Sequence, residues 1–398
     1  MSIKFVKNEQ LSFGVNDNKH LLLIGDNKDC LEYLLLSYKG KIKCIYIDPP
    51  YGKNGKGKYA KTNYTNAITR DNLLSMLYPR LVLARELLSD DGVLFCSIDD
   101  RNQAHVKLLF DEIFGEENFV SNLIWQKKKG GSQDAHHFAK EHEYILCYAK
   151  KDWQINEQTQ EQDETEFNKI INGKKAKIVK LEKWGSGSLR EDCPSLYYYI
   201  KDPYGKDFFP MAPNGKEGRW RKKPENLDSD HIYWQEDSKG KLTPYEVLYF
   251  DEMKTKDKII KIRTIFTEYG TTTDATKEIQ SIFGDKIFDT PKPSNLIKHL
   301  MKVSSQKDSI ILDFFAGSGT TGEAVLKLNR EDGGNRKFIL CQNNEKTKTT
   351  PNGIAYDVTA KRLKRVMTGE CYDGTKPEAW LKKHEPYGGA LDALEYVE

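Results

Sequence analysis

An apolar run at residues 41–47 ends abruptly in an acid, two prolines and an aromatic ring, at Asp48, Pro49, Pro50 and Tyr51. Proline cannot continue a central strand, so this run predicts a β-strand that stops at a rigid loop. Open α/β sheets bind ligands in loops at the carboxyl ends of their strands. The loop offers a carboxylate, a free carbonyl and a ring, which suit the exocyclic amino group of a flat base. Asp-Pro pairs also mark ordinary turns, so the loop alone leaves both interpretations open.

A second apolar run leads into a loop of small residues at 310–322, and a helical pattern follows it. Glycines let a backbone approach a ligand closely, and a helix start presents free N–H groups. Gly317, Gly319 and Gly322 give the spacing G-x-G-x-x-G, which is a weak signal alone, and the lysine of a P-loop is missing. No recognisable βαβ unit with a ribose-binding acid supports a dinucleotide site. A tight packing turn between strand and helix remains the alternative.

Together the two loops resemble those of DNA amino-methyltransferases that use S-adenosylmethionine. In that family Asp-Pro-Pro-Tyr is the catalytic motif, which implies that Asp48, Pro49, Pro50 and Tyr51 are the catalytic residues. The catalytic motif precedes the cofactor loop with a long segment between them, as in the β group of the family. The chain looks most similar to adenine-specific modification subunits of type III restriction systems and to shorter relatives of them.

The resemblance also implies a set of cofactor-binding residues. Residues 21–27 look like the strand whose acid contacts the cofactor adenine, and residues 289–293 look like the lead-in to the cofactor domain. The family usually places a ribose-binding acid after the second strand, where this chain offers Gln342 or Glu345. The predicted S-adenosylmethionine contacts are Asp26, Lys292, Asp313, Phe315, Ala316, Gly317, Ser318, Gly319, Thr320, Thr321, Gln342 and Glu345.

The composition shifts near residue 150 and divides the chain. Residues 1–150 and 289–398 alternate strand and helix patterns, which predicts a mostly parallel α/β sheet. Residues 151–288 are polar and aromatic, with short strand-like runs and turn signals, which predicts a β-rich insert. By resemblance, the flanking segments form the two parts of a Rossmann-like methyltransferase sheet with permuted motif order. The second part binds the cofactor, and the insert is the target-recognition domain.

The net charge of +3 over 398 residues is no polyanion-binding signature, so any nucleic-acid surface must be a local patch. Two basic clusters are candidates, and the second interleaves charge with the aromatic Trp220, as a DNA-facing loop would. Each cluster alone is also typical of solvated surface. The predicted DNA-binding residues are Lys127, Lys128, Lys129, Arg219, Arg221, Lys222 and Lys223.

Other patterns are interpreted more plainly. The chain has no run of 18 apolar residues and no signal-type start, which favours a cytoplasmic protein without a membrane partner. A histidine group at 136, 137 and 142 lacks the cysteine or carboxylate set that would complete a metal site, so no metal is expected. A basic helix face is expected to be solvated, with the residues Lys361, Arg362, Lys364 and Arg365.

These features predict a site-specific DNA methyltransferase, the modification part of a restriction-modification system, that methylates adenine N6 of a base flipped out of duplex DNA. Asp48 and the Pro49 carbonyl are expected to accept the amino hydrogens, and Tyr51 is expected to stack on the base. Asp rather than Ser at position 48 favours adenine, by resemblance. The alternatives are methylation of RNA, of cytosine N4 or of a protein amide, and a DNA-recognition subunit that mainly recruits a restriction partner. Candidate partners besides duplex DNA are a restriction subunit and a second copy of the chain.

Overall fold

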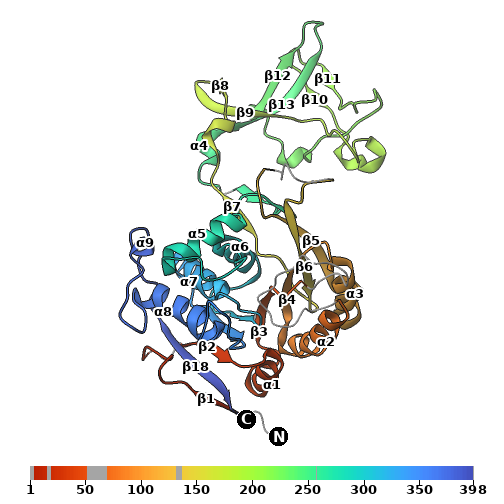
Figure 1. The fold of residues 1–398 in the computed structure, drawn as a ribbon. Coiled ribbons are helices and arrows are strands. Elements are labelled where there is room, and N and C mark those ends of the chain that lie inside the picture. The colour runs from red at the N-terminus through yellow and green to blue at the C-terminus, as the bar shows by residue number, and fades with distance from the viewer. Residues whose placement is uncertain (1–3, 16–18, 52–69, 131–136, 257, 398) are drawn as a thin grey trace. The chain divides into compact units, whose positions relative to one another are not determined.

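The computed structural model describes residues 4–15, 19–51, 70–130, 137–256 and 258–397 (Figure 1). It divides into two compact units, a larger one from Met1–Asn156 with Ile262–Glu398 and a smaller one from Glu157–Lys261. His136, considered above as a metal ligand, lies outside the described residues. Within the described residues, no helix combines the length and the apolar character needed to cross a bilayer.

The larger unit is built on a ten-stranded mixed sheet. The strands from β18 to β4 are mutually parallel, whereas β1 and β6 run antiparallel to their neighbours. This confirms the expectation of a mostly parallel α/β sheet. In spatial order the strands are β1 (Lys4–Lys7), β18 (Ala390–Val397), β2 (Lys19–Ile24), β17 (Lys337–Gln342), β16 (Ile310–Asp313), β3 (Ile42–Ile47), β4 (Leu88–Ile98), β6 (His142–Ala149), β5 (Phe119–Gln126) and β15 (Ile265–Phe266).

The sheet interleaves the two halves of the chain. β16 follows the insert in sequence but pairs in parallel with β3, through Ile311 with Cys44 and Leu312 with Ile45. Because β3 leads into the Asp48 loop and β16 leads into the glycine loop, the two loops emerge side by side at one edge of the sheet. The strand pairing therefore brings together motifs that are more than 260 residues apart in sequence.

Both faces of the sheet are covered by helices, and β3 shows why. Its alternate residues Cys44 and Tyr46 belong to one core, while Ile45 and Ile47 belong to the other. Successive strand side chains point to opposite faces, so an unbroken apolar strand needs cover on both sides. The first core is closed by α5 (Thr272–Phe283), α6 (Ser294–Ser304), α7 (Thr320–Asp332), α8 (Lys361–Thr368) and α9 (Glu378–Leu381), and the second by α1 (Asn27–Tyr38), α2 (Arg70–Leu87) and α3 (Gln103–Phe114).

The smaller unit is β-rich, as expected. Its sheets are antiparallel and pack two small cores, one around Val247 and one around the buried Trp220. The unit is shorter than the expected insert of 151–288, because β15 and α5 pack within the larger unit. Its elements are β7 (Gln158–Gln160), β8 (Lys169–Ile171), β9 (Lys174–Lys180), β10 (Ile200–Lys201), β11 (Asp207–Phe208), β12 (Ile232–Glu236), β13 (Leu242–Tyr249), α4 (Phe250–Met253) and β14 (Lys258–Ile260).

Candidate active site

A cavity of about 720 Å³ lies in the larger unit, at the carboxyl ends of β2, β3, β16 and β17. Its lining includes all four predicted catalytic residues and most of the predicted cofactor contacts. Gly319 and Glu345 are the two predicted contacts that do not line it. The volume is in the range of sites that bind cofactors or small ligands.

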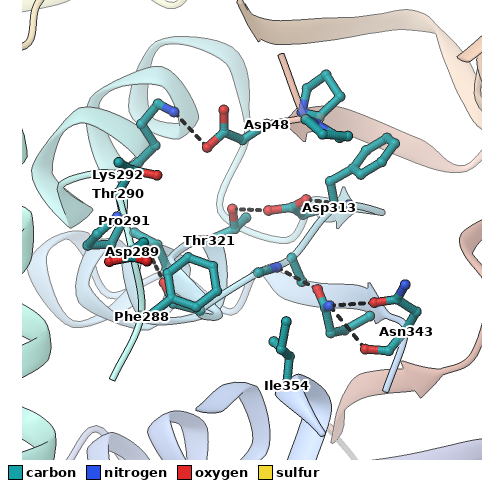
Figure 2. A pocket seen from close by; sticks show the side chains of 18 of the residues that line it. Asp48, Phe288, Asp289, Thr290, Pro291, Lys292, Asp313, Thr321, Asn343 and Ile354 are labelled. Atoms are coloured by element: carbon teal, nitrogen blue, oxygen red, sulfur yellow. Dashed lines mark hydrogen bonds and ion pairs between the residues drawn. The ribbon is translucent and has the colours of Figure 1, made fainter. Parts of the chain in front are cut away.

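The Asp48 carboxylate is held on both of its oxygens. Oδ2 accepts a hydrogen bond from the Lys292 ammonium at 2.6 Å (Figure 2). Oδ1 accepts one from the Tyr51 hydroxyl at 2.9 Å. The Asp48 side chain keeps 26 % of its exposure, whereas that of Lys292 keeps 8 %. Lys292 comes from the segment before α6, so the contact spans both halves of the chain.

Glu143 of β6 completes this cluster, although the sequence did not single it out. Its Oε2 lies 3.0 Å from the Tyr51 hydroxyl and 3.5 Å from the Lys292 nitrogen. Its Oε1 accepts from the Lys127 ammonium at 3.0 Å. An acid within an otherwise apolar strand run was the available signal, because carboxylates are rarely buried without a partner.

Burial and charged neighbours shift the pKa of Asp48, Glu143 and Lys292. Burial raises the pKa of Asp48, as does Glu143, while Lys292 opposes the rise. Burial also works to raise the pKa of Glu143, but Lys292 and Lys127 outweigh it, and the pKa ends below its ordinary value. Burial works against the charge of Lys292, but the two carboxylates prevail and raise its pKa. Lys292 therefore stays cationic beside two acids at neutral pH.

The glycine loop after β16 is held by backbone and side-chain hydrogen bonds. The Asp313 carboxylate accepts from the Phe315 amide at 2.9 Å and from the Thr321 hydroxyl at 2.5 Å. Gly317 has a φ of +52°, in the left-handed region that favours glycine. Its N–H donates to Gln342 Oε1 at 2.7 Å, and its carbonyl accepts from the Thr359 hydroxyl at 2.6 Å. Burial raises the pKa of Asp313 to about 7.

A buried arginine supports this loop from behind. Arg362 has no exposed surface and donates to Ser318 Oγ at 3.1 Å, to Thr320 Oγ1 at 2.8 Å and to Glu323 at 2.8 Å. The expectation that Arg362 lies on a solvated helix face is wrong. The face of α8 that carries it packs against α7, so its charge is matched inside the core by Glu323.

The residues predicted to contact the adenine and the ribose of the cofactor differ in whether they line the cavity. The Asp26 carboxylate caps α1 through the Lys28 amide and also accepts from Arg80, at 2.8 Å in both cases. Arg80 lines the cavity and was not predicted. Of the two candidates for the ribose contact, Gln342 lines the cavity. Its amide oxygen accepts a hydrogen bond from the Gly317 N–H.

The basic residues of the two predicted clusters differ in their exposure and in their ion pairing. Lys127 lines the cavity and is paired with Glu143, while Lys128 and Lys129 are exposed. In the smaller unit, the interpretation of Trp220 as a DNA-facing aromatic is wrong. Its ring is fully buried, and its indole N–H donates to the Tyr198 carbonyl.

The charges beside Trp220 are likewise divided. Arg219 donates to the Gly187 carbonyl, and Lys222 is paired with Glu246. Arg221 and Lys223 are exposed, and Lys223 lies 3.8 Å from Glu225. Trp220 belongs to the small core, Arg219 and Lys222 beside it are half-buried, and Arg221 and Lys223 are exposed.

Comparisons with known proteins place the chain among related sequences. A family model described as DNA methylase matches residues 42–353. The chain is 33% identical over 397 aligned residues to the type III restriction-modification enzyme StyLTI Mod subunit of Salmonella typhimurium, covering 90% of this chain and 58% of that protein. It is 33% identical over 413 residues to the EcoPI Mod subunit of Escherichia phage P1, covering 88% and 62%. It is 34% identical over 373 residues to the type II methyltransferase M.KpnI of Klebsiella pneumoniae, covering 87% of each. The chain thus spans about three fifths of the two Mod subunits and most of M.KpnI.

Proposed function

The chain belongs to the DNA methylase family, and from this membership we propose that it transfers a methyl group from S-adenosylmethionine to adenine N6 in duplex DNA. The observation that carries the proposal is the parallel pairing of β16 with β3. It puts the Asp-Pro-Pro-Tyr loop and the glycine loop on one cavity, where a methyl donor and an amino group can meet. Holding two reactants together in the right geometry accounts for much of the rate of such a transfer.

Asp48 and the Pro49 carbonyl are the proposed acceptors for the two hydrogens of the target amino group. The amino lone pair is delocalised into the base, and two acceptors placed in tetrahedral directions draw it out of conjugation. The nitrogen then attacks the methyl carbon, a new N–C bond forms as the S–C bond breaks, and the amino group loses one proton. Preorganised acceptors are effective because they need not reorient during the reaction.

S-adenosylmethionine supplies an activated methyl group bound to a sulfonium sulfur. The lining suits such a ligand, because the glycine loop around Gly317 and the carboxylates of Asp26 and Asp48 all line the one cavity. We propose that the loop residues from Phe315 to Thr321 hold the methionine part. Asp26 and Gln342 are the proposed contacts for the adenine and the ribose.

The DNA surface is proposed from exposed basic residues. A stacked base cannot reach a closed cavity, so the target nucleotide must leave the helix, and Tyr51 is the proposed stacking partner. Among the predicted basic residues, Lys128, Lys129, Arg221 and Lys223 are the strongest candidates for phosphate contacts because they are exposed. The smaller unit is the proposed reader of the target sequence.

A role in restriction-modification rests on the relatives, two of which are Mod subunits of type III enzymes. We propose that the chain is the modification part of such a system and that a restriction subunit is its partner. Self-association as a homodimer stays a prediction.

The test is to express the chain in cells whose DNA lacks methylation and to sequence the modified bases, with Asp48→Ala as the control. We expect N6-methyladenine at a fixed position of one short sequence, and none with Asp48→Ala. Calorimetry should find that Asp48→Ala still binds S-adenosylmethionine, because the side chain is proposed to grip the base. N4-methylcytosine would change the substrate assignment, and unmodified DNA despite sequence-specific binding would favour the recruiting subunit.

A further inference from the structure

The cluster around Asp48 contains more charge than gripping an amino group requires. Asp48 and Glu143 are two carboxylates, and Lys292 and Lys127 are two ammonium groups, so the cluster is balanced. Asp48 comes from the loop after β3, Glu143 from β6, Lys292 from the segment before α6 and Lys127 from the position directly after β5. Removing one partner from a buried ion pair leaves the other uncompensated, so each charge here constrains the rest.

Lys292 binds the Asp48 oxygen that a target amino group would need. Its ammonium donates to Asp48 Oδ2 at 2.6 Å, which is the oxygen the Tyr51 hydroxyl leaves open. A target amino group that donates to this oxygen must share it with the ammonium or displace it. Glu143 Oε2 lies 3.5 Å from the same nitrogen, close enough to receive it after a small shift.

We propose that Glu143 and Lys292 are positioning residues for methyl transfer: Lys292 keeps Asp48 ionised and aimed, and Glu143 draws the ammonium of Lys292 aside when the target amino group binds. This inference rests on the proposed function. In it, Lys292 fills the place of the amino group in the free protein. Glu143 takes over the ammonium when the base arrives, so that Asp48 is released as an acceptor without leaving a buried charge unpaired.

Other groups also face Asp48 and enter its titration. Tyr46 lies on β3, Cys96 on β4 and Asp313 on β16, and each is within electrostatic reach of Asp48. The Tyr51 hydroxyl bonds to it directly. Lys292 and Glu143 carry opposite charges, so removing one or the other should shift the pKa of Asp48 in opposite directions.

The experiment follows the Asp48 carboxyl directly in the full-length protein. Carbon-13 labelling of aspartate carboxyls allows NMR titration, and Asp48→Asn assigns the signal by its absence. We expect Glu143→Gln to lower the pKa of Asp48, because a neighbouring negative charge is gone. We expect Lys292→Met to raise it, because the neighbouring positive charge is gone. Lys127→Met is the matched control, because it also removes a positive charge, but Lys127 is paired with Glu143 rather than with Asp48. It should therefore shift the pKa of Asp48 less than Lys292→Met does.

The rate of methyl transfer to unmethylated DNA provides the second readout. The acid limb of its pH profile should move down in Glu143→Gln and up in Lys292→Met, with about a tenfold change in rate on that limb for each unit of pKa. Glu143→Gln should also lose rate at neutral pH, because Lys292 no longer has an anion to move to, and Glu143→Asp should recover part of the loss.

The outcomes separate the two proposals. If the wild-type protein transfers no methyl group, the proposed function fails, while the titration still tests the positioning role. An Asp48 pKa that is unchanged in both variants, or shifted the same way in both, would overturn the inference. Glu143→Gln preserves shape, and Lys292→Gln provides a second neutral variant should the methionine one not fold.

Discussion

Among single residues, the acids of the candidate site differ in their partners. Asp48 follows β3 and Asp313 ends the neighbouring β16; Asp313 is buried, whereas Asp48 is half-buried. Asp48 receives an ammonium, whereas Asp313 receives an amide N–H and a hydroxyl. A full opposite charge stabilises a carboxylate more than neutral donors do. Asp313 is therefore the acid that titrates near neutral pH, at about 7.

We predict that Asp313 makes folding stability depend on pH. Its folded pKa of about 7 lies above the ordinary 3.8, so its contribution is fully present below pH 4 and is lost as pH rises through 7. The difference corresponds to roughly 4 kcal/mol. Asp313→Asn should remove this loss, so urea unfolding between pH 5 and 8 should show the variant gaining on the wild type as pH rises. Thr321→Val deletes one hydrogen-bond donor to the Asp313 carboxylate, so the decline of its unfolding free energy should lie at higher pH than that of the wild type. A difference between the wild type and Asp313→Asn that stays constant with pH would contradict the argument.

Among the elements, the turn from β16 into α7 is shaped by what packs around it. A Cβ added at Gly317 would lie 3.1 Å from the Phe288 ring, and one at Gly322 would lie 2.7 Å from Leu363. The first glycine leaves room at the cavity, while the second lets α7 approach α8 and the sheet. The helix-packing interpretation therefore holds at Gly322, whereas ligand approach at Gly317 stays a prediction.

We predict that Gly317→Val abolishes cofactor binding. A β-branched residue is strained at a φ of +52°, by about 1–2 kcal/mol, and its side chain would also crowd Phe288 at the cavity. Gly333→Val is the matched control, because Gly333 has a φ of +67° with open space around it, at the other end of α7. Calorimetry with S-adenosylmethionine should find binding lost only in Gly317→Val. Equal affinity in the two folded variants would remove this loop from the cofactor site.

We predict that Arg362→Met destabilises the larger unit by about 3–5 kcal/mol, because it leaves Glu323 buried without its cation. The double variant with Glu323→Met should recover most of this loss, since an apolar pair of similar volume removes both charges. Urea unfolding of the two variants tests this. Arg362→Met should also weaken cofactor binding, since Arg362 holds Ser318 and Thr320. If both variants were equally unstable, packing rather than charge would explain the role of Arg362.

Across the whole molecule, the chain leaves the larger unit after Asn156 and re-enters it at Ile262. Close to these two points the chain forms a short antiparallel pair, in which Gln158 faces Ile260. Directly opposed residues in such a pair lie about 5 Å apart. The smaller unit therefore begins and ends on neighbouring strands, and it has its own cores.

We predict that replacing Glu157–Lys261 by a short glycine-serine linker leaves a folded larger unit that binds the cofactor with its affinity unchanged. The shortened protein should bind duplex DNA far more weakly and without sequence preference. DNA affinity across a salt series is the measurement, and the slope should flatten by roughly 0.9 for each phosphate that the protein no longer neutralises. Unchanged sequence-specific binding would move target recognition to the larger unit.

Most of the architecture was predictable because its signals are local. Unbroken apolar runs such as 42–47 predict strands covered on both faces, and the prolines after them predict where the strands stop. The β-rich insert followed from short strands and turn signals. Its boundaries did not, because β15 has only two residues, and only its pairing with Ile124 and Trp125 assigns it to the larger sheet.

The site was predictable in its motifs but not in its charges. Asp48, Gly317 and Lys292 stand in recognisable segments. Arg362 looks like an ordinary surface-helix residue in the sequence, and the signal for Glu143 is only that of an acid within a strand. Their burial depends on which face of a helix or strand packs against another element. The two packed elements lie far apart in the sequence, so a short stretch of sequence does not show it. The same holds for Trp220, whose neighbours suggested exposure while its ring lies at the centre of a small core.

The strands, the two loops and the order in which they occur follow from the amino-acid sequence alone, because proline, glycine and apolar spacing act on the local backbone. Three further features arise only when the chain has folded: β16 lies beside β3, Lys292 reaches Asp48 across 244 positions, and Glu143 stands behind both. Burial and electrostatic balance are properties of the assembled core. A charge becomes a buried partner only once the sheet has brought its opposite within a few ångströms.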